Sequence, residues 1–236
     1  MVKTSVPVDR RSAALRCIRQ RLRAVLGRYP LLFMTVQKWR GSGQRFRSLL
    51  ADGTDIVIEG FPRSANSWTV RVLRYWQRPR VVQIAHHQHS EAQVLAGVAR
   101  ALPVVVLLRD PGDAVESLHE LDGTDLDWGL RRWTSFYRAV EGVVDGVVIA
   151  TFPQATKDFG SVVERVNARF GTDFAFGPTD EALFARITSR MYDTGYPHTA
   201  RRQRSADPTL ALDPDQLAEA RSLYRRLADR AEGTAT

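Results

Sequence analysis

The segment 61–68, Phe-Pro-Arg-Ser-Ala-Asn-Ser-Trp, carries the residue types of an anion-binding turn. It follows a strand-like apolar run at 55–60 and opens a helix-like run at 69–76. A strand that turns tightly into a helix leaves the first backbone N–H groups of that helix without intrahelical partners, so these groups attract anions. The hydroxyl of Ser64 and the cation of Arg63 add to this attraction. The segment therefore predicts a site for a phosphate-like group.

The same residues allow two other interpretations. Ser64 or Asn66 can act as an ordinary helix cap while Arg63 is solvated. A magnesium-dependent P-loop is the second alternative, but that pattern needs glycine, lysine and a hydroxyl residue in succession. This chain has Ala65, Asn66 and Ser67 at those positions. A kinase or GTPase is therefore disfavoured, and the cation of the turn is Arg63.

A second motif follows a buried strand. Residues 103–108, Pro-Val-Val-Val-Leu-Leu, form a continuous apolar run that is typical of a central strand covered on both faces. Arg109 leaves the carboxyl end of this run, where open α/β sheets bind ligands. Ser117 lies about two helical turns later. The two side chains are predicted to meet the same anion, although Arg109 can instead pair with Asp113 or Glu116.

Three of the five histidines, His86, His87 and His89, lie close together after a strand-like run at 80–84. Imidazole clusters bind zinc, but no cysteine or acidic residue with ligand spacing accompanies this one, and Cys17 is far away in the chain. Imidazole also titrates near neutral pH and can accept a proton in catalysis. The cluster thus predicts a metal site or a general base, with a structural, helix-capping role as the alternative for His89.

The two motifs, in this order and at this separation, resemble those of the sulfotransferases that use 3′-phosphoadenosine-5′-phosphosulfate (PAPS). In that family a loop like Pro-Lys-Ser-Gly-Thr-Thr-Trp holds the 5′-phosphosulfate. An arginine, followed after seven intervening residues by a serine, holds the 3′-phosphate. The resemblance covers roughly residues 55–170 and is specific because two separated motifs agree, whereas each alone is weak. It implies a P-loop-like sulfotransferase architecture.

The resemblance implies PAPS-binding roles for residues of both motifs. Arg63 stands where the family has lysine, and Trp68 is expected near the adenine. The family's Tyr-Glu-Asp after a later strand is replaced by Phe152-Pro153-Gln154, so only an aromatic residue near the adenine is kept there. The residues expected to bind PAPS are Arg63, Ser64, Ala65, Asn66, Ser67, Trp68, Arg109, Ser117 and Phe152, with Arg201 and Arg202 either reaching the 3′-phosphate or forming a solvated basic loop.

The resemblance also implies in-line displacement at sulfur with a histidine as the base. The family places this base after the second strand, facing the transferable group. We prefer His87 to His86, although their spacing does not decide between them. Arg63 and the N–H groups of the turn are expected to stabilise charge on the leaving oxygen. A guanidinium does not give up its proton, so charge stabilisation is kept while any proton donation by the family's lysine is lost. The scheme requires no metal.

The alternation of short apolar runs with helix-length amphipathic segments predicts an α/β fold with a mainly parallel central sheet and helices on both faces. We expect a basic N-terminal helical segment at 1–50 and a sulfotransferase-like α/β domain at 51–236. A fourth strand is expected at 146–152. Helices are expected at 159–170, ended by a glycine, and at 214–231.

Positive charge is concentrated in the first part of the chain. Residues 1–50 contain twelve Lys/Arg and a single acid, a net charge of +11, whereas the whole chain carries +8, which leaves −3 for residues 51–236. Within 10–28, apolar residues recur at helical intervals between arginines. Such a segment docks on its own domain, lies on an anionic membrane or touches nucleic acid. We expect docking, keep peripheral membrane contact as a hypothesis and expect no nucleic acid partner.

These observations together predict a cytoplasmic, PAPS-dependent sulfotransferase. One cysteine fits a reducing compartment, and no apolar run approaches the ~20 residues of a membrane span. The expected acceptor is a hydroxyl or amine of a small molecule, a lipid or a carbohydrate. A P-loop-type nucleotide kinase, which requires ATP and magnesium, is one alternative. The other is a non-catalytic binding protein whose function depends on residues 1–50 rather than on His86 and His87.

Overall fold

The computed structural model describes residues 48–192 and 212–233. Its centre is a sheet of four strands in the order β2-β1-β3-β4, and every neighbouring pair of these strands is parallel. The strands are β1 (Ile56–Gly60), β2 (Ile84–His86), β3 (Val104–Leu108) and β4 (Val148–Thr151). The helices are α3 (Asn66–Trp76), α4 (Glu91–Ala99), α5 (Pro111–Asp122), α6 (Leu126–Glu141), α7 (Phe152–Lys157), α8 (Phe159–Phe170), α9 (Glu181–Tyr192) and α10 (Pro214–Glu232), with a short 3-10 turn at Val144–Gly146.

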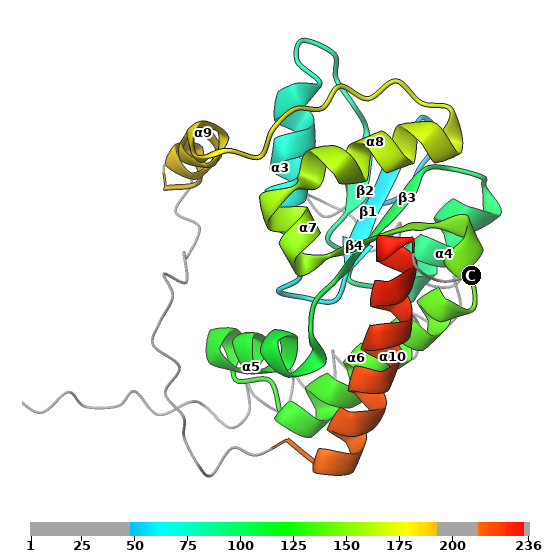
Figure 1. Cartoon of the computed structure of the whole chain (residues 1–236), viewed down its shortest axis with the longest axis vertical. Coiled ribbons are helices and arrows are strands. Elements are labelled where there is room, and N and C mark those ends of the chain that lie inside the picture. Colours follow the sequence, from blue (N-terminus) through cyan, green and yellow to red (C-terminus); the bar gives the residue numbers. More distant parts are fainter. Residues whose placement is uncertain (1–47, 193–211, 234–236) are drawn as a thin grey trace, which may run out of the picture.

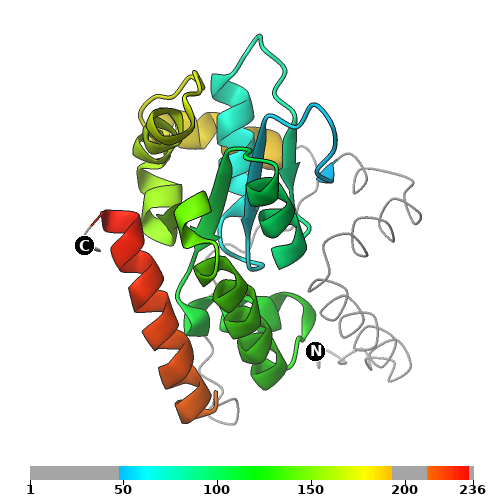
Figure 2. The ribbon, with the colours of Figure 1, turned by 90° about the vertical axis from the view of Figure 1, so that its right-hand side faces the viewer.

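Helices cover both faces of the sheet, as the sequence predicted (Figure 1 and Figure 2). Successive side chains of each strand point to opposite faces of the sheet and pack into two separate apolar layers. Val57, Val104 and Val106 face α4, α6 and α10, whereas Ile58 and Val105 face α3, α7 and α8. The fold is therefore α/β with two helical layers around a parallel sheet, and all carboxyl ends of the strands lie at one edge.

Helix α6 packs against the sheet and contacts the carboxyl ends of β1 and β3. Trp133, Phe136 and Tyr137 are completely buried, as expected for an aromatic stripe at helical spacing. The hydroxyl of Tyr137 donates to the carbonyl of Leu107 (2.5 Å) and accepts from the backbone N–H of Phe61 (3.3 Å). Because burial disfavours the phenolate, the pKa of Tyr137 is raised and it stays a donor. The start of the turn after β1 is thus anchored in the core.

The second strand lies further along the chain than predicted. We expected a strand at 80–84, but β2 begins at Ile84 and pairs with β1 from Ile56 onwards. Gln83 is held at the start of the pairing by Asp55, whose carboxylate accepts its backbone N–H (2.7 Å), while Val81 is 79% exposed. The prediction of a strand at 80–84 was wrong because it treated Val81 and Val82 as strand residues, whereas only Val82 is buried.

The remaining predicted elements are confirmed. Strand β4 lies within the expected range 146–152, and α8 ends at Gly171, which has the left-handed φ of 65° of a helix terminus. Helix α10 covers the expected 214–231. The short helix α7 was not predicted. It starts directly after β4 because Thr151 and Gln154 form a capping box.

Several predictions concern residues outside the described ranges. These are the helical segment within 1–47, Cys17, Arg201 and Arg202. The described chain begins at Ser48, and Leu50 is buried in the core beside α4. Among the helices of residues 48–192 and 212–233, none has the length and apolar character to cross a membrane.

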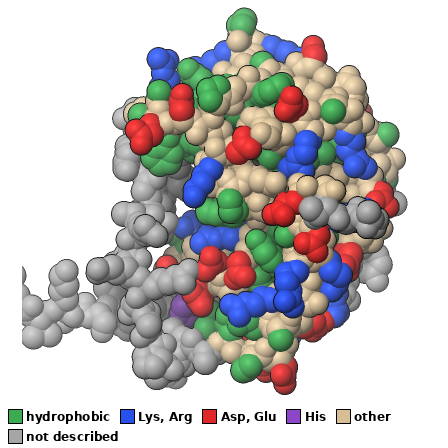
Figure 3. Space-filling view, viewed as in Figure 1, with side chains coloured by type: hydrophobic (Ala, Val, Ile, Leu, Met, Phe, Trp, Pro, Cys, Tyr) green, Lys and Arg blue, Asp and Glu red, His purple; other side chains and the backbone are tan. Residues whose placement is uncertain are grey.

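Charges of both signs are interspersed on the face shown in Figure 3. Helix α10 contributes Arg226, paired with Glu141 (2.7 Å), and Arg230, paired with Asp145 (3.5 Å). Exposed pairs of this kind add little stability.

Candidate functional site

The turn from β1 to α3, residues 61–65, has an unusual backbone. Arg63 and Ala65 both have positive φ, 70° and 72°, and Ala65 is the residue before the first turn of α3. No side chain of the described residues caps this helix. Asn66 instead donates to the carbonyl of Phe61 (3.2 Å), and Ser64 is buried below the turn. The alternative of an ordinary cap by Ser64 or Asn66 is therefore wrong, because neither side chain accepts a first-turn N–H of α3.

The two sequence motifs meet at this turn. The Nε of Arg63 donates to the hydroxyl of Ser117 (3.0 Å), across 54 residues of sequence. Arg109 Nη1 donates to the backbone carbonyl of Arg63 (2.8 Å), and its guanidinium lies 4.5 Å from the ring centre of Phe152. Four of the predicted ligand-binding residues are thus in direct contact, although they come from three different strand ends.

The histidines approach the same turn from β2. Ser67 Oγ lies 2.9 Å from His87 Nε2, and His87 Nδ1 lies 2.6 Å from His86 Nδ1. Arg74 of α3 approaches the far side of this pair, with Nη2 3.1 Å from His86 Nε2. Because β1 and β2 are parallel, the carboxyl end of β2 lies beside α3, with His87 at its first turn and His86 at its last.

Burial keeps both imidazoles uncharged. It lowers the pKa of His86 to about 4, and the neighbouring cation of Arg74 acts in the same direction. The pKa of His87 is lowered to about 3, mainly by burial and then by the neighbouring histidines and Arg74. Both rings are therefore neutral near pH 7, which is the form that can accept a proton.

The loop that carries the histidines is held by a buried carboxylate. Glu59 of β1 accepts the backbone N–H groups of Gln88 (2.8 Å) and His89 (3.0 Å) and the side-chain amide of Gln93 (2.8 Å). These bonds support the left-handed φ of His87, 58°, and of His89, 49°. Burial raises the pKa of Glu59 to about 7, against the effect of its hydrogen bonds. Glu59 was not predicted as a functional residue. Its position as an acid within the apolar strand run 55–60 was the feature that could have indicated it.

A buried ion pair holds the same loop from the other side. Arg132 of α6 pairs with Glu91 of α4 (2.7 Å) and also donates to the carbonyl of His89 (3.1 Å). His89 itself shares a hydrogen bond with the carbonyl of Gly60 (2.8 Å), and Ser90, not His89, caps α4. His89 therefore ties the loop to the end of β1, so its role in these contacts is structural but is not helix capping.

Trp68 lies at the outer rim of the turn. Its ring is 5.3 Å from that of Phe184, a residue of α9 that is 56% exposed. Trp68 Nε1 is buried without a hydrogen-bond partner among the described residues. Phe184 was missed by sequence analysis because α9 follows a long irregular segment and carries no recognisable motif. The two rings are tilted by 40° and together form an apolar surface beside the turn.

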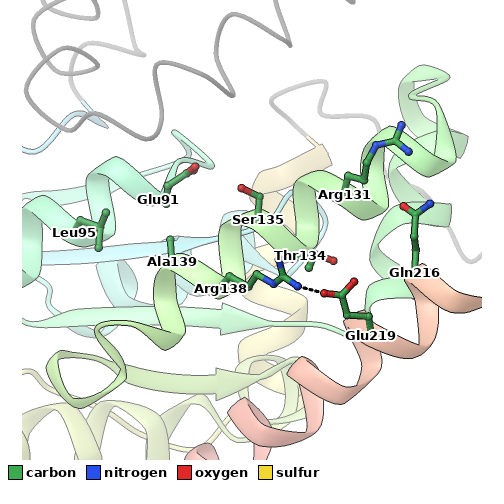
Figure 4. Close-up of a pocket in the computed structure, with 9 residues that line it drawn as sticks. All are labelled: Glu91, Leu95, Arg131, Thr134, Ser135, Arg138, Ala139, Gln216 and Glu219. Atoms are coloured by element: carbon green, nitrogen blue, oxygen red, sulfur yellow. Dashed lines mark hydrogen bonds and ion pairs between the residues drawn. The ribbon is translucent and has the colours of Figure 1, made fainter.

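A hollow on the surface of the described chain lies away from these residues (Figure 4). It has a volume of about 410 Å³ and lies between α4, α6 and α10. Arg138 and Glu219 form an ion pair across it. None of the residues of the two motifs lines this hollow. In the described part of the chain, no group of three or more His, Cys, Asp or Glu side chains is arranged to hold a metal ion.

Comparisons with known proteins give structural likenesses but no match in sequence. No protein-family model and no curated protein sequence matches the chain. A solved structure similar to this one is the crystal structure of mouse sulfotransferase SULT7A1 complexed with PAP. The two share 14% sequence identity, with a TM-score of 0.46, over 78% of this chain and 92% of that chain.

Proposed function

We propose that this protein is a PAPS-dependent sulfotransferase that transfers a sulfuryl group to a hydroxyl or amine. The observation that carries the proposal is the contact between the two motifs, Arg63 to Ser117 at 3.0 Å and Arg109 to the carbonyl of Arg63 at 2.8 Å. Two candidate anion-binding elements that are in contact at the carboxyl-terminal edge of the sheet fit a ligand with phosphates at two positions.

The residues of the turn fit the 5′-phosphosulfate. An uncapped helix terminus with no acidic residue in its first turn attracts an anion through its N–H groups and dipole. The hydroxyl of Ser67 and the cation of Arg63 lie on the same turn. The buried Oδ1 of Asn66, the first residue of α3, has no hydrogen-bond partner among residues 48–192 and 212–233. It is therefore available to accept a hydrogen bond from a ligand hydroxyl.

The second element fits a 3′-phosphate. Arg109 and Ser117 supply a guanidinium and a hydroxyl, a pair that recognises phosphate by charge-assisted hydrogen bonds. The ring of Phe152 stacks against Arg109 and limits where the guanidinium can move. Trp68 with Phe184 provides the apolar surface on which an adenine ring can stack.

The chain's own residues suit in-line transfer. PAPS supplies the sulfuryl group, with the 3′,5′-bisphosphate as leaving group. A neutral histidine of the His86–His87 pair takes the proton from the acceptor as the acceptor attacks. Arg63 and the N–H groups of the turn stabilise negative charge on the leaving oxygen. Arg63 gives electrostatic help only, because a guanidinium keeps its proton.

The acceptor and the basic segment belong to the same proposal. The acceptor is a small molecule, a lipid or a carbohydrate. For the basic segment 1–50 we keep docking on its own domain as the expectation and peripheral contact with an anionic membrane surface as the alternative. An acidic surface attracts such a segment in a salt-dependent way. Release from anionic vesicles at high salt is the corresponding test.

The decisive experiment is calorimetry on the full chain. We expect 3′,5′-bisphosphoadenosine to bind more tightly than adenosine 5′-monophosphate, and ATP with magnesium to bind weakly. Transfer of label from PAPS to a panel of hydroxyl and amine acceptors then tests the reaction. Tighter binding of ATP with magnesium would favour the kinase alternative. Absence of binding by any of these nucleotides would favour the non-catalytic alternative.

A further inference from the structure

The hydrogen-bond chain that starts at Arg74 has only one consistent direction. A guanidinium donates and cannot accept, so His86 Nε2, 3.1 Å from Arg74 Nη2, is an acceptor. A neutral imidazole has a single N–H, so the proton of His86 lies on Nδ1 and is donated to His87 Nδ1, 2.6 Å away. His87 then carries its proton on Nε2 and donates it to Ser67 Oγ at 2.9 Å.

We propose that Arg74 is a positioning residue that fixes this direction and thereby decides which ring nitrogen of His86 and His87 can accept a proton. The catalytic meaning of this inference rests on the proposed function. In the direction that Arg74 imposes, the two lone pairs are those of His86 Nε2, against Arg74, and of His87 Nδ1, against His86. Neither points to Ser67. With this direction His87 Nε2 donates to Ser67, and it can accept a proton there only after the direction is reversed.

A base at His87 Nε2 requires the opposite direction. The Nδ1 proton of His86 moves to His87 Nδ1, the Nε2 proton of His87 goes to solvent, and His86 Nε2 takes one proton from solvent. The number of protons in the pair is unchanged. The new N–H of His86 would face the guanidinium of Arg74, and two opposed donors leave a hydrogen bond unmade. Arg74 is exposed in the last turn of α3, so it can swing into solvent and permit the reversal.

The charges around the pair favour neutral rings, which the single-proton argument requires. Burial lowers the pKa of His86 to about 4 and that of His87 to about 3. Arg74 of α3 and His89 of the histidine loop lower both pKa values further, and Arg71 of α3 lowers that of His87. The nearby acid Glu59 of β1 accepts the backbone N–H groups of Gln88 and His89.

Nitrogen NMR of the full chain, labelled with 15N-histidine, reports the position of each ring proton. His86→Gln and His87→Gln variants assign the signals. We expect His86 as the Nδ1–H form and His87 as the Nε2–H form, each favoured by more than about tenfold near neutral pH. Arg74→Glu offers only an acceptor and should reverse both forms. Arg74→Lys offers only a donor and should keep them.

A matched control is Arg78→Glu, the same charge change beyond the end of α3, where the guanidinium lies 5.8 Å from the ring centre of Tyr75. It should leave both ring protons in place. A wild-type His87 with its proton on Nδ1, an equal mixture of the two forms, or an Arg74→Glu variant without reversal would overturn the inference. Titration of the same samples with 3′,5′-bisphosphoadenosine tests the proposed function separately, since its failure leaves the proton positions unchanged.

Discussion

The turns that follow β1 and β3 lie at the same edge of the sheet, yet they treat the next helix differently. The turn after β1 spans residues 61–65, and no side chain of the described residues caps α3. Only Arg109 and Asp110 separate β3 from α5, and Asp110 accepts the backbone N–H of Asp113 (3.1 Å). The terminus of α3 has neither a side-chain cap nor an acidic residue in its first turn, whereas that of α5 has the carboxylates of Asp110 and Asp113.

The difference indicates how, under the proposed function, two strand ends hold one ligand. In that proposal the open turn after β1 binds through its backbone, which requires a longer turn and left-handed residues such as Arg63 and Ala65. The capped turn after β3 binds through side chains: it positions Arg109 and begins the helix that carries Ser117. The contact of Arg63 with Ser117 joins the two turns.

The largest expected effect concerns His87, which contacts Ser67 just after the open turn. The capped turn after β3 has no corresponding histidine in the described chain. His87→Ala should lower the rate of sulfuryl transfer by about 10²–10⁴-fold, the usual range for loss of a general base. Nucleotide affinity, measured by calorimetry, should change little. If His86→Ala gives the larger loss, the base is His86 and our preference between the neighbours is wrong.

Ala65→Asp makes the open turn resemble the capped one. A carboxylate at the terminus of α3 occupies the N–H groups and repels an anion, and like charges in contact cost several kcal/mol. We expect the affinity for 3′,5′-bisphosphoadenosine to fall by about 10²-fold. Ala65→Asn is the matched neutral control and should lose much less. Equal affinities for both variants would show that the anion binds elsewhere.

Arg109→Ala removes the side chain that the capped turn contributes. A charge-assisted hydrogen bond is worth about 1.5–3 kcal/mol, so we expect roughly a 10–100-fold loss of affinity for 3′,5′-bisphosphoadenosine. Adenosine 5′-monophosphate lacks the 3′-phosphate and should be affected little. The same loss for both nucleotides would remove the assignment of Arg109 to the 3′-phosphate.

Glu59 tethers the histidine loop to β1, while β3 has the apolar Val106 in the paired position. The pKa of Glu59 is raised in the fold, from 4.5 to about 7, so the native state binds its proton more tightly than the unfolded chain. Its contribution to stability is present at low pH and is lost as pH rises through that interval, by up to about 3 kcal/mol. Urea unfolding from pH 5 to 8 should show this slope for the wild type relative to Glu59→Gln, and parallel curves would contradict it.

The smallest effect is expected at the capped turn itself. Asp110→Ala removes the cap of α5 and should cost about 1 kcal/mol of unfolding free energy, measured in urea. Affinity for 3′,5′-bisphosphoadenosine should not fall, because no ligand role is assigned to this carboxylate. Asp110→Asn keeps an acceptor and should restore most of the stability. A large loss of affinity in Asp110→Ala would mean that the two turns do not differ as described.

The sequence alone determined the parts of this protein that depend on neighbours in the chain. Apolar runs and amphipathic periods predicted the parallel sheet, α8 and α10, because burial against a core imposes those patterns locally. The residue types of 61–68, with Arg109 and Ser117, indicated two anion-binding elements. Their contact had to be inferred from resemblance, since 54 residues separate Arg63 from Ser117.

Only the tertiary structure decided the features that join distant segments. The hold of Glu59 on the histidine loop, the approach of Phe184 to Trp68 and the start of β2 at Ile84 all depend on partners remote in sequence. The direction of the hydrogen bonds from Arg74 through His86 does so too, because a guanidinium on one helix meets a ring on a neighbouring strand. Local sequence patterns do not encode such contacts, which arise when packing brings the elements together.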